Sequence, residues 1–236
     1  MTPGKGGWET VSSSPIPFDR RSPLPRALTE VEVEEMTARF VEAARRSLQA
    51  GFEVLEIHMA HGYLFHQFLS PLTNHREDRY GGALENRLRF SLETAKEVRN
   101  VWPESLPLFI RISCTDWVEN GWDLFQSIEL CRGFKDVGVD LIDCSSGGLV
   151  PDAKIPAGPG YQVPFAAAIR QQAGITTGAV GLITEPAQAE QIVSTAQADA
   201  VLLAREFLRD PYWPLHAARA LGIDLPWPKP YERAKK

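Results

Sequence analysis

One segment of the sequence, residues 56–82, holds the densest group of side chains that could perform chemistry. His58, His61 and Tyr63 follow a short apolar run there, at the junction between an expected strand and a loop. Two adjacent imidazoles can hydrogen-bond a carbonyl or anionic oxygen and make a conjugated carbon electrophilic, and a nearby tyrosine can deliver a proton. The spacing therefore predicts a site that activates an oxygen-bearing substrate. Two alternatives stay open: the imidazoles satisfy buried backbone groups, or they bind a metal, although no third ligand stands at an obvious spacing.

A second group combines glycine-rich turns with an arginine. It comprises residues 145–148 (Ser-Ser-Gly-Gly), residues 177–181 (Thr-Gly-Ala-Val-Gly) and the pair Ala204-Arg205. Glycines let the backbone approach a ligand closely, and exposed N–H groups beside an arginine suit a phosphate. Each segment taken alone is an ordinary turn, but all three stand at the ends of expected strands, and together they predict a phosphate site.

Other polar or reactive side chains have simpler interpretations. Arg111 lies in an apolar run, so its guanidinium needs either an electron-rich planar ligand or an ion pair with Glu56 or Asp143. Cys114 and Cys144 have no activating neighbour in the sequence and are predicted to be small core residues. His66 and His75 are predicted to be structural or surface residues, and the charged run at 76–79 a solvated loop.

Regular elements must position these residues, and their pattern alternates. Thr29 and Glu32 have the spacing of a capping box, so a helix is expected to begin there and to end near Gly51. Short runs rich in Val, Ile and Leu then alternate with amphipathic helical patterns, which predicts parallel strands joined by right-handed crossovers. The runs are almost continuously apolar, so burial on both faces is expected. The expected strands are residues 54–59, 107–112, 139–144, 175–181 and 200–204.

The candidate side chains follow the ends of these strands, where (β/α) barrels build their active sites. No G-x-G-x-x-G follows an early strand, which argues against a dinucleotide-binding Rossmann fold. The sequence therefore favours the TIM (β/α)8-barrel fold, here a partial barrel with about five βα units in residues 29–236. Residues 1–28, rich in Pro, Gly and Ser, are expected to form an N-terminal loop or arm.

Composition excludes several classes of protein. The chain has 236 residues with 25 Lys+Arg and 30 Asp+Glu, and a net charge of −5 does not suit a nucleic-acid binder. No apolar run reaches the length of a membrane span, and the first ten residues lack the apolar stretch of a signal peptide. Three cysteines without C-x-x-C spacing indicate neither a disulfide framework nor a thiolate metal site. We therefore expect a cytoplasmic protein without nucleic-acid or membrane partners.

At this point the sequence resembles the Old Yellow Enzyme family of FMN-dependent ene-reductases, in particular its NADPH dehydrogenase and xenobiotic reductase-like subgroup. The segments that carry the resemblance are EIHMAHGYLFHQFLSPLTNHREDRYGGALENRLRF, LFIRIS, LIDCSSGG, TTGAVG, LLAREFLRDP and the terminal YER. The resemblance implies an NADPH (or NADH) oxidoreductase that uses FMN to reduce the activated C=C bond of a small enone-type substrate. Hydride would reach the β-carbon and a proton the α-carbon.

The resemblance also assigns roles to residues. His58 and His61 would hold the substrate oxygen, and Tyr63 would donate the proton. Arg111 would lie against the flavin near its pyrimidine edge, and Arg233 would match an arginine that reaches into a neighbouring subunit's active site. The FMN phosphate and its surroundings would be held by Ser146, Gly147, Gly148, Gly181, Ala204 and Arg205.

The sequence departs from the family pattern in three places. Ala204 stands where the family has glycine, the chain continues after Arg233 as Ala-Lys-Lys without an aromatic end, and three strand–helix units expected before residues 1–50 are missing. Five strands cannot close the usual barrel, so the first and last strands are expected to leave unpaired edges. Association through these edges, or a homo-oligomer, is therefore expected.

Three functions compete at this stage. The first is the FMN oxidoreductase. The second is a catalytically silent partial barrel that acts as an assembly partner, which the missing units favour. The third is a metal-assisted lyase or hydrolase that uses His58 and His61.

Overall fold

A five-stranded parallel sheet forms the centre of the molecule. The computed structural model describes residue 4 and residues 6–235. The sheet order is β3-β4-β5-β6-β7, so each strand pairs with the next one in the chain. The strands are β3 (Leu55–Met59), β4 (Leu108–Ser113), β5 (Leu141–Ser145), β6 (Thr176–Ala179) and β7 (Ala200–Val201). All four pairings are parallel, as the alternation of strands and helices predicts.

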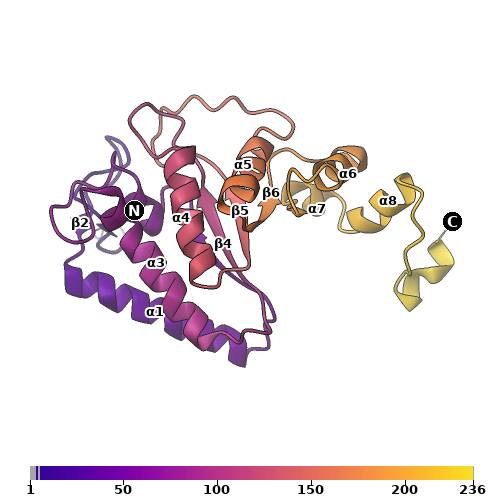
Figure 1. Ribbon diagram of the computed structural model, residues 1–236, viewed down its shortest axis with the longest axis horizontal. Coiled ribbons are helices and arrows are strands. Elements are labelled where there is room, and N and C mark those ends of the chain that lie inside the picture. The colour runs from indigo at the N-terminus through magenta and orange to yellow at the C-terminus, as the bar shows by residue number, and fades with distance from the viewer. Residues whose placement is uncertain (1–3, 5, 236) are drawn as a thin grey trace.

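Helices cover one face of this sheet (Figure 1). The capping box of Thr29 and Glu32 is present, with Glu32 N donating to Thr29 Oγ1 at 3.3 Å, and the helix begins where it predicts. The elements on this side, with the short helices at the strand ends, are α1 (Glu30–Gln49), α2 (Leu64–Leu69), α3 (Leu84–Val101), α4 (Leu124–Asp136), α5 (Val163–Ala173), α6 (Pro186–Ser194) and α7 (Arg205–Arg209).

Burial along the strands differs from the sequence expectation. In β3, Ile57 and Met59 are buried under the helices, whereas Glu56 and His58 on the opposite face are exposed. The expectation of burial on both faces holds for β5, in which every residue is buried, but it is wrong for β3. The reason is that the helices pack on one face of the sheet only. The described residues leave the opposite face of β3, which we call the inner face, open.

The N-terminal arm has more structure than predicted. Two short strands, β1 (Val11–Ser12) and β2 (Arg26–Ala27), pair in parallel. Arg76 fixes this arm because its guanidinium donates to the carbonyl oxygens of Ser13, at 3.0 Å, and Leu28, at 2.5 Å. The prediction of a solvated charged loop at 76–79 is therefore wrong for Arg76, whose side chain is only 7% exposed. Residues 1–3 and 5 of the predicted arm lie outside the described part of the chain.

The hydrophobic core lies between the sheet and its helices. It includes large buried side chains such as Trp102, Trp122 and Phe90. Cys114, Cys131 and Cys144 are free and fully buried there, as predicted for Cys114 and Cys144. Burial raises the pKa of all three thiols. Among the described residues, no helix combines the length and apolar character needed to cross a bilayer.

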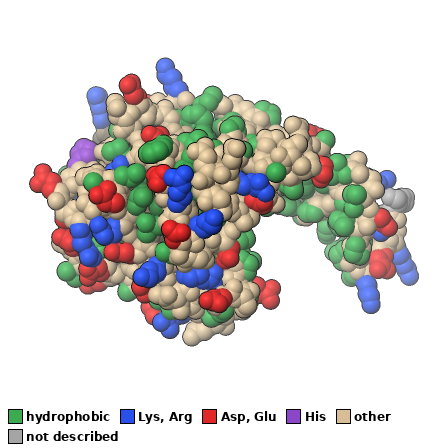
Figure 2. Space-filling view, in the orientation of Figure 1, with side chains coloured by type: hydrophobic (Ala, Val, Ile, Leu, Met, Phe, Trp, Pro, Cys, Tyr) green, Lys and Arg blue, Asp and Glu red, His purple; other side chains and the backbone are tan. Residues whose placement is uncertain are grey.

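The C-terminal segment extends away from the sheet. After α8 (Trp213–Ala220) the chain runs outward to a 3₁₀ helix, η2 (Lys229–Ala234), at the far end of the molecule (Figure 1). Hydrophobic side chains gather on this extension (Figure 2), and Ile223 and Tyr231 are 57% and 47% exposed.

Candidate functional site

The strand register places three polar residues and one glycine in a single row across the sheet. His58 is paired with Arg111, Arg111 with Asp143, and Asp143 with Gly178. Neighbouring positions in a parallel sheet point to the same face, so this row places His58, Arg111 and Asp143 on the inner face, opposite the helices. The sequence prediction that strand ends meet in one place is therefore correct for this row.

His58, His61 and Tyr63 lie together at the end of β3, as predicted. The ring centroids of His58 and His61 are 5.1 Å apart, and those of His58 and Tyr63 are 5.6 Å apart. Tyr63 is 64% exposed, so its hydroxyl is accessible to a ligand. Three hydrogen-bonding side chains thus stand next to one another at the end of β3.

A tight turn at residues 60–63, which we call the histidine turn, holds these side chains. His61 and Gly62 both have left-handed backbone conformations, with φ of 60° and 73°. This conformation costs a non-glycine residue roughly 1–2 kcal/mol, so the surroundings must hold His61 in place. A Cβ at Gly62 would overlap the carbonyl oxygen of Gly148, which explains the need for glycine at this point.

Every backbone N–H of the turn from His61 to Tyr63 has an acceptor. His61 N donates to Ser113 Oγ at 2.9 Å, and Gly62 N donates to His66 Nδ1 at 3.0 Å. Tyr63 N donates to the carbonyl oxygen of Ala60 at 3.2 Å. The histidine turn is therefore fixed by the chain itself.

The two imidazoles are held in their neutral form. Desolvation, and secondarily the positive charge of Arg111, lowers the pKa of His58 below its usual range. The same two causes lower the pKa of His61 to about 4. A neutral imidazole carries one N–H donor and one acceptor nitrogen, so at neutral pH each ring can offer a hydrogen bond to a ligand oxygen.

Arg111 forms the ion pair that the sequence left as an alternative. Its Nε lies 3.2 Å from Asp143 Oδ2, and the Asp143 side chain is fully buried. Burial raises the pKa of Asp143 to about 7, although Arg111 acts in the opposite direction. The Arg111 contact is an ion pair without hydrogen-bond geometry, and neither oxygen of the Asp143 carboxyl group has a hydrogen-bond donor among the described residues. The Arg111 side chain is 27% exposed, so the pair leaves it accessible from the inner face.

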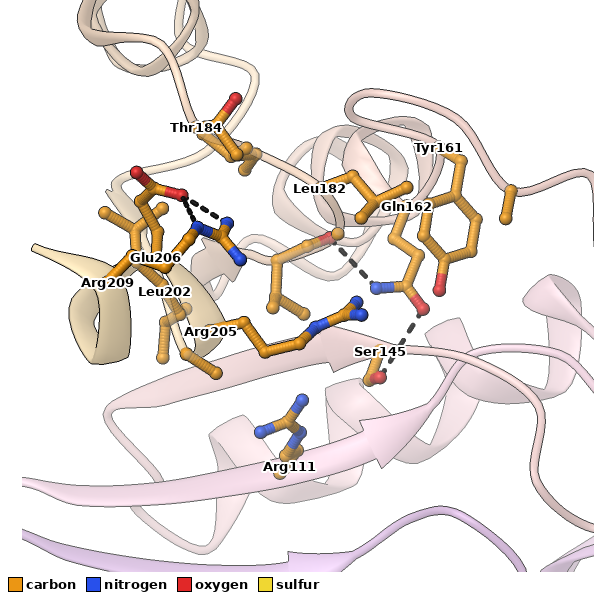
Figure 3. Close-up of a pocket in the computed structure, with 16 residues that line it drawn as sticks. Arg111, Ser145, Tyr161, Gln162, Leu182, Thr184, Leu202, Arg205, Glu206 and Arg209 are labelled. Carbon is orange, nitrogen blue, oxygen red and sulfur yellow. Dashed lines mark hydrogen bonds and ion pairs between the residues drawn. The ribbon is translucent and has the colours of Figure 1, made fainter.

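A cavity of about 320 Å³ opens beside this pair, at the ends of β5, β6 and β7; we call it the arginine cavity. Figure 3 shows Arg111 and Arg205 pointing into it, Arg111 from β4 and Arg205 from the start of α7. Arg209, on the same helix, forms an ion pair with Glu206. Arg205 has no carboxylate within salt-bridge distance in the part of the chain that the structure describes. The cavity thus presents an uncompensated positive charge, which suits an anion.

Backbone donors complete this lining. Gly181 and Ala204 also line the cavity, together with Arg205. No acceptor for the backbone N–H groups of these three residues occurs within residue 4 and residues 6–235. Ala204 has φ of −108°, an ordinary value for any residue, so alanine in place of the family's glycine adds a methyl group without backbone strain.

The remaining predicted residues lie elsewhere. Gly147 and Gly148 do not line the arginine cavity; Gly148 packs against the histidine turn, where a Cβ would come within 2.7 Å of His61 Cα. Ser146 is buried and donates to Gln162 Oε1 at 2.6 Å. Arg233 lies in η2 on the extension, away from both groups of residues (Figure 1). Their predicted roles stay predictions.

Sequence reasoning missed Gln162, which together with Ser145 joins the two groups. Ser145 Oγ lies 2.7 Å from His61 Nε2 and 3.4 Å from Gln162 Oε1, and Gln162 Nε2 donates to the carbonyl oxygen of Val180 at 2.9 Å. Gln162 is only 2% exposed. Its sequence neighbourhood gives no signal of this role, because the contact depends on the fold of the long loop before α5.

The described residues contain no group of three or more His, Cys, Asp or Glu side chains arranged to hold a metal ion. His58 has Arg111 as its neighbour across the sheet.

Comparison with known proteins gives a consistent result. A family model described as NADH:flavin oxidoreductase / NADH oxidase matches residues 9–223. The NADPH dehydrogenase of Geobacillus thermodenitrificans is 49% identical over 225 residues, which cover 95% of this chain and 65% of that protein. The NADPH dehydrogenase of Bacillus velezensis is 50% identical, with 96% and 66% covered. The chain thus spans about two thirds of the length of these curated relatives.

Solved structures show the same architecture. A 2-naphthoyl-CoA reductase complex superposes with a TM-score of 0.83 at 28% identity and covers 91% of this chain and 33% of that one. Histamine dehydrogenase from Rhizobium sp. 4-9 gives 0.78 at 28% identity, with 91% and 32% covered. The prediction of a partial (β/α) barrel is confirmed, and so is the resemblance to flavin-dependent NADPH dehydrogenases. The match over residues 9–223 shows that this chain belongs to the NADH:flavin oxidoreductase / NADH oxidase family.

Proposed function

We propose that this chain provides the phosphate-binding and substrate-activating parts of an FMN-dependent NAD(P)H oxidoreductase that reduces activated C=C bonds. The observation that carries the proposal is the arginine cavity beside the histidine turn: an unpaired arginine and free backbone donors lie next to two neutral imidazoles and an accessible tyrosine.

The residues present fit an FMN molecule. Arg205 and the free N–H groups of Gly181 and Ala204 suit the phosphate, since donors without acceptors in the chain are completed by an anion. Arg111, held at its Nε by Asp143, is accessible to an electron-rich ring. When bound, FMN supplies the hydride-transfer chemistry that links NAD(P)H oxidation to reduction of a substrate.

The side chains of the histidine turn act on the substrate. His58 and His61 hydrogen-bond the carbonyl oxygen of an α,β-unsaturated compound and draw electron density from its β-carbon, which makes that carbon electrophilic. Tyr63 delivers the proton that the α-carbon requires, because its exposed hydroxyl stands beside His58. Arg111 and the desolvation of the two rings keep both imidazoles neutral at the pH where NAD(P)H is used.

The test is a titration of the full chain with FMN, followed by absorbance and flavin fluorescence. We expect saturable binding, bleaching of the bound flavin by NADPH or NADH under anaerobic conditions, and reoxidation by an α,β-unsaturated ketone. A preparation that binds no FMN at any concentration would overturn the proposal. Bleaching without reoxidation by the ketone would overturn the substrate class alone.

We also propose that the chain associates in solution, in the cytoplasm, through its sheet edges. Among the described residues β3 pairs only with β4, and β7 only with β6, so both outer edges present backbone groups to a partner. In this proposal Arg233, on the projecting extension, reaches the site of such a partner. Light scattering that gives a monodisperse monomer would contradict this proposal.

A further inference from the structure

A buried histidine–aspartate pair lies directly behind the histidine turn. His66 and Asp116 are both 0% exposed, and His66 Nε2 lies 2.8 Å from Asp116 Oδ1. Asp116 also accepts hydrogen bonds at Oδ2 from Ser70 Oγ and from Trp122 N, both at 2.7 Å. The Asp116 carboxyl group thus accepts two hydrogen bonds at Oδ2, while its Oδ1 faces the His66 ring at ion-pair distance without a hydrogen bond that meets the angular criteria.

The other nitrogen of His66 faces the turn. Nδ1 accepts the hydrogen bond of the Gly62 N–H at 3.0 Å, so this nitrogen carries no proton. In the neutral ring the proton then lies on Nε2, which faces Asp116 Oδ1 at 2.8 Å. The two contacts together require the neutral Nε2–H tautomer, since a charged imidazolium would direct a second N–H against that of Gly62.

We propose that the His66–Asp116 pair positions the histidine turn: Asp116 fixes the tautomer of His66, and His66 holds the Gly62 N–H and with it the imidazole of His61 and the phenol of Tyr63. The inference rests on the proposed function in so far as His61 and Tyr63 act on substrate. His66 touches no reacting atom, and it acts through the backbone of Gly62.

The strain of the turn gives this contact its importance. His61 and Gly62 are successive left-handed residues, and His61 is not a glycine. Gln67 Nε2 donates to the Gly62 carbonyl oxygen at 2.6 Å, so both polar backbone groups of Gly62 bind side chains of α2. Loss of the His66 acceptor would leave the half-buried Gly62 N–H without a partner in this chain and release one side of the turn.

The first experiment determines the tautomer by ¹⁵N NMR of the histidine rings in the full chain, without flavin. We expect one protonated and one unprotonated ring nitrogen in His66 around neutral pH, with a correlation from the unprotonated nitrogen to the Gly62 amide. Two protonated nitrogens would overturn the proposal, because Nδ1 could then not accept. This measurement needs no variant and no activity.

The second experiment compares two substitutions. In His66→Asn the side-chain oxygen takes the place of Nδ1 and can accept from Gly62; in His66→Gln the amide nitrogen takes the place of Nε2 and can donate to Asp116. We expect amide exchange at Gly62 to stay slow in H66N and to become fast in H66Q, with H75Q, at an exposed histidine, unchanged. Equal exchange in H66N and H66Q would overturn the proposal.

The third readout uses the flavin-loaded chain. We expect kcat of H66Q to fall about 10- to 100-fold with little change in KM, as for a misplaced catalytic group, and H66N to recover most of it. A parallel loss in both variants would contradict the positioning role. Failure of the chain to bind FMN would overturn the proposed function, while the tautomer and exchange results would still decide the present inference.

Discussion

In the histidine turn, the backbone N–H groups of His61, Gly62 and Tyr63 all donate to acceptors of this chain. In the arginine cavity, those of Gly181, Ala204 and Arg205 have no acceptor within the described residues. The first region is thus fixed before any ligand arrives, whereas the second has donors and a positive charge that a ligand must satisfy. This difference separates a preorganised substrate site from a cofactor site, and each prediction below tests one side of it.

The largest effect is expected for Gly62→Ala. The new Cβ would overlap the Gly148 carbonyl oxygen, and the left-handed φ adds strain. The free energy of unfolding should therefore be about 2–5 kcal/mol lower than that of the unmodified chain. Gly82→Ala is the matched control, since Gly82 has φ of 75° and open space around its Cβ position. Urea denaturation measures both. Similar losses in G62A and G82A would show that the histidine turn is not tightly packed.

Asp143 lies at the border between the two regions and gives a pH effect. Its pKa is raised from 3.8 to about 7, so the folded chain binds the proton more tightly than the unfolded chain does. Its contribution to stability is therefore complete below about pH 4 and is lost as pH rises to about 7, by up to about 1.4 kcal/mol for each pKa unit.

Asp143→Asn should remove this loss of stability with rising pH. His61, whose pKa is lowered, contributes in the opposite direction, because its stability is lost as pH falls from 6.5 towards 4. The difference between the denaturation profiles of D143N and the unmodified chain isolates the carboxyl group. Parallel profiles of unfolding free energy against pH would show that the pKa of Asp143 is not raised in the folded chain.

Arg205→Ala tests the cavity. Removal of an unpaired guanidinium from a phosphate site should weaken FMN binding by about 1.5–3 kcal/mol, or roughly 10- to 100-fold in Kd. Arg209→Ala is the control, because Arg209 lies on the same helix but is paired with Glu206. Calorimetric titration with FMN distinguishes them. Equal losses in R205A and R209A would indicate a general effect of charge rather than a defined contact.

The smallest effect is expected for Ala204→Gly. Ala204 has an ordinary φ of −108°, so restoring the family's glycine relieves no strain and should destabilise the chain by about 0.5–1 kcal/mol through added backbone freedom. FMN affinity should change less than in R205A. A large gain in affinity would show that the methyl group obstructs the phosphate.

Local patterns in the sequence predicted much of the fold. The capping box at Thr29 and Glu32, and the alternation of apolar runs and helices, depend on neighbours within a few residues, and the structure confirms both. The last strand is shorter than predicted: β7 ends at Val201 rather than at residue 204, because residues 202–205 turn to line the cavity.

The parts that could not be predicted depend on contacts between distant segments. Arg76 looks like one member of an exposed charged run, yet carbonyl groups of the N-terminal arm bury it. Gln162 joins Ser146 and Val180 only because the loop before α5 folds back over the strand ends. The residues of the histidine turn were predicted from their types, whereas the hydrogen bonds that hold it, from Ser113 and His66, were not.

The three cysteines give the chain a built-in probe of its own folding. Cys114, Cys131 and Cys144 are inside the core, and burial raises their pKa values, so the native protein offers no reactive thiolate to a labelling reagent. Modification then requires opening of the core, and the rate of thiol labelling reports the free energy of that opening. A cysteine introduced at an exposed position such as Leu208 would therefore be labelled selectively, without removal of the native three.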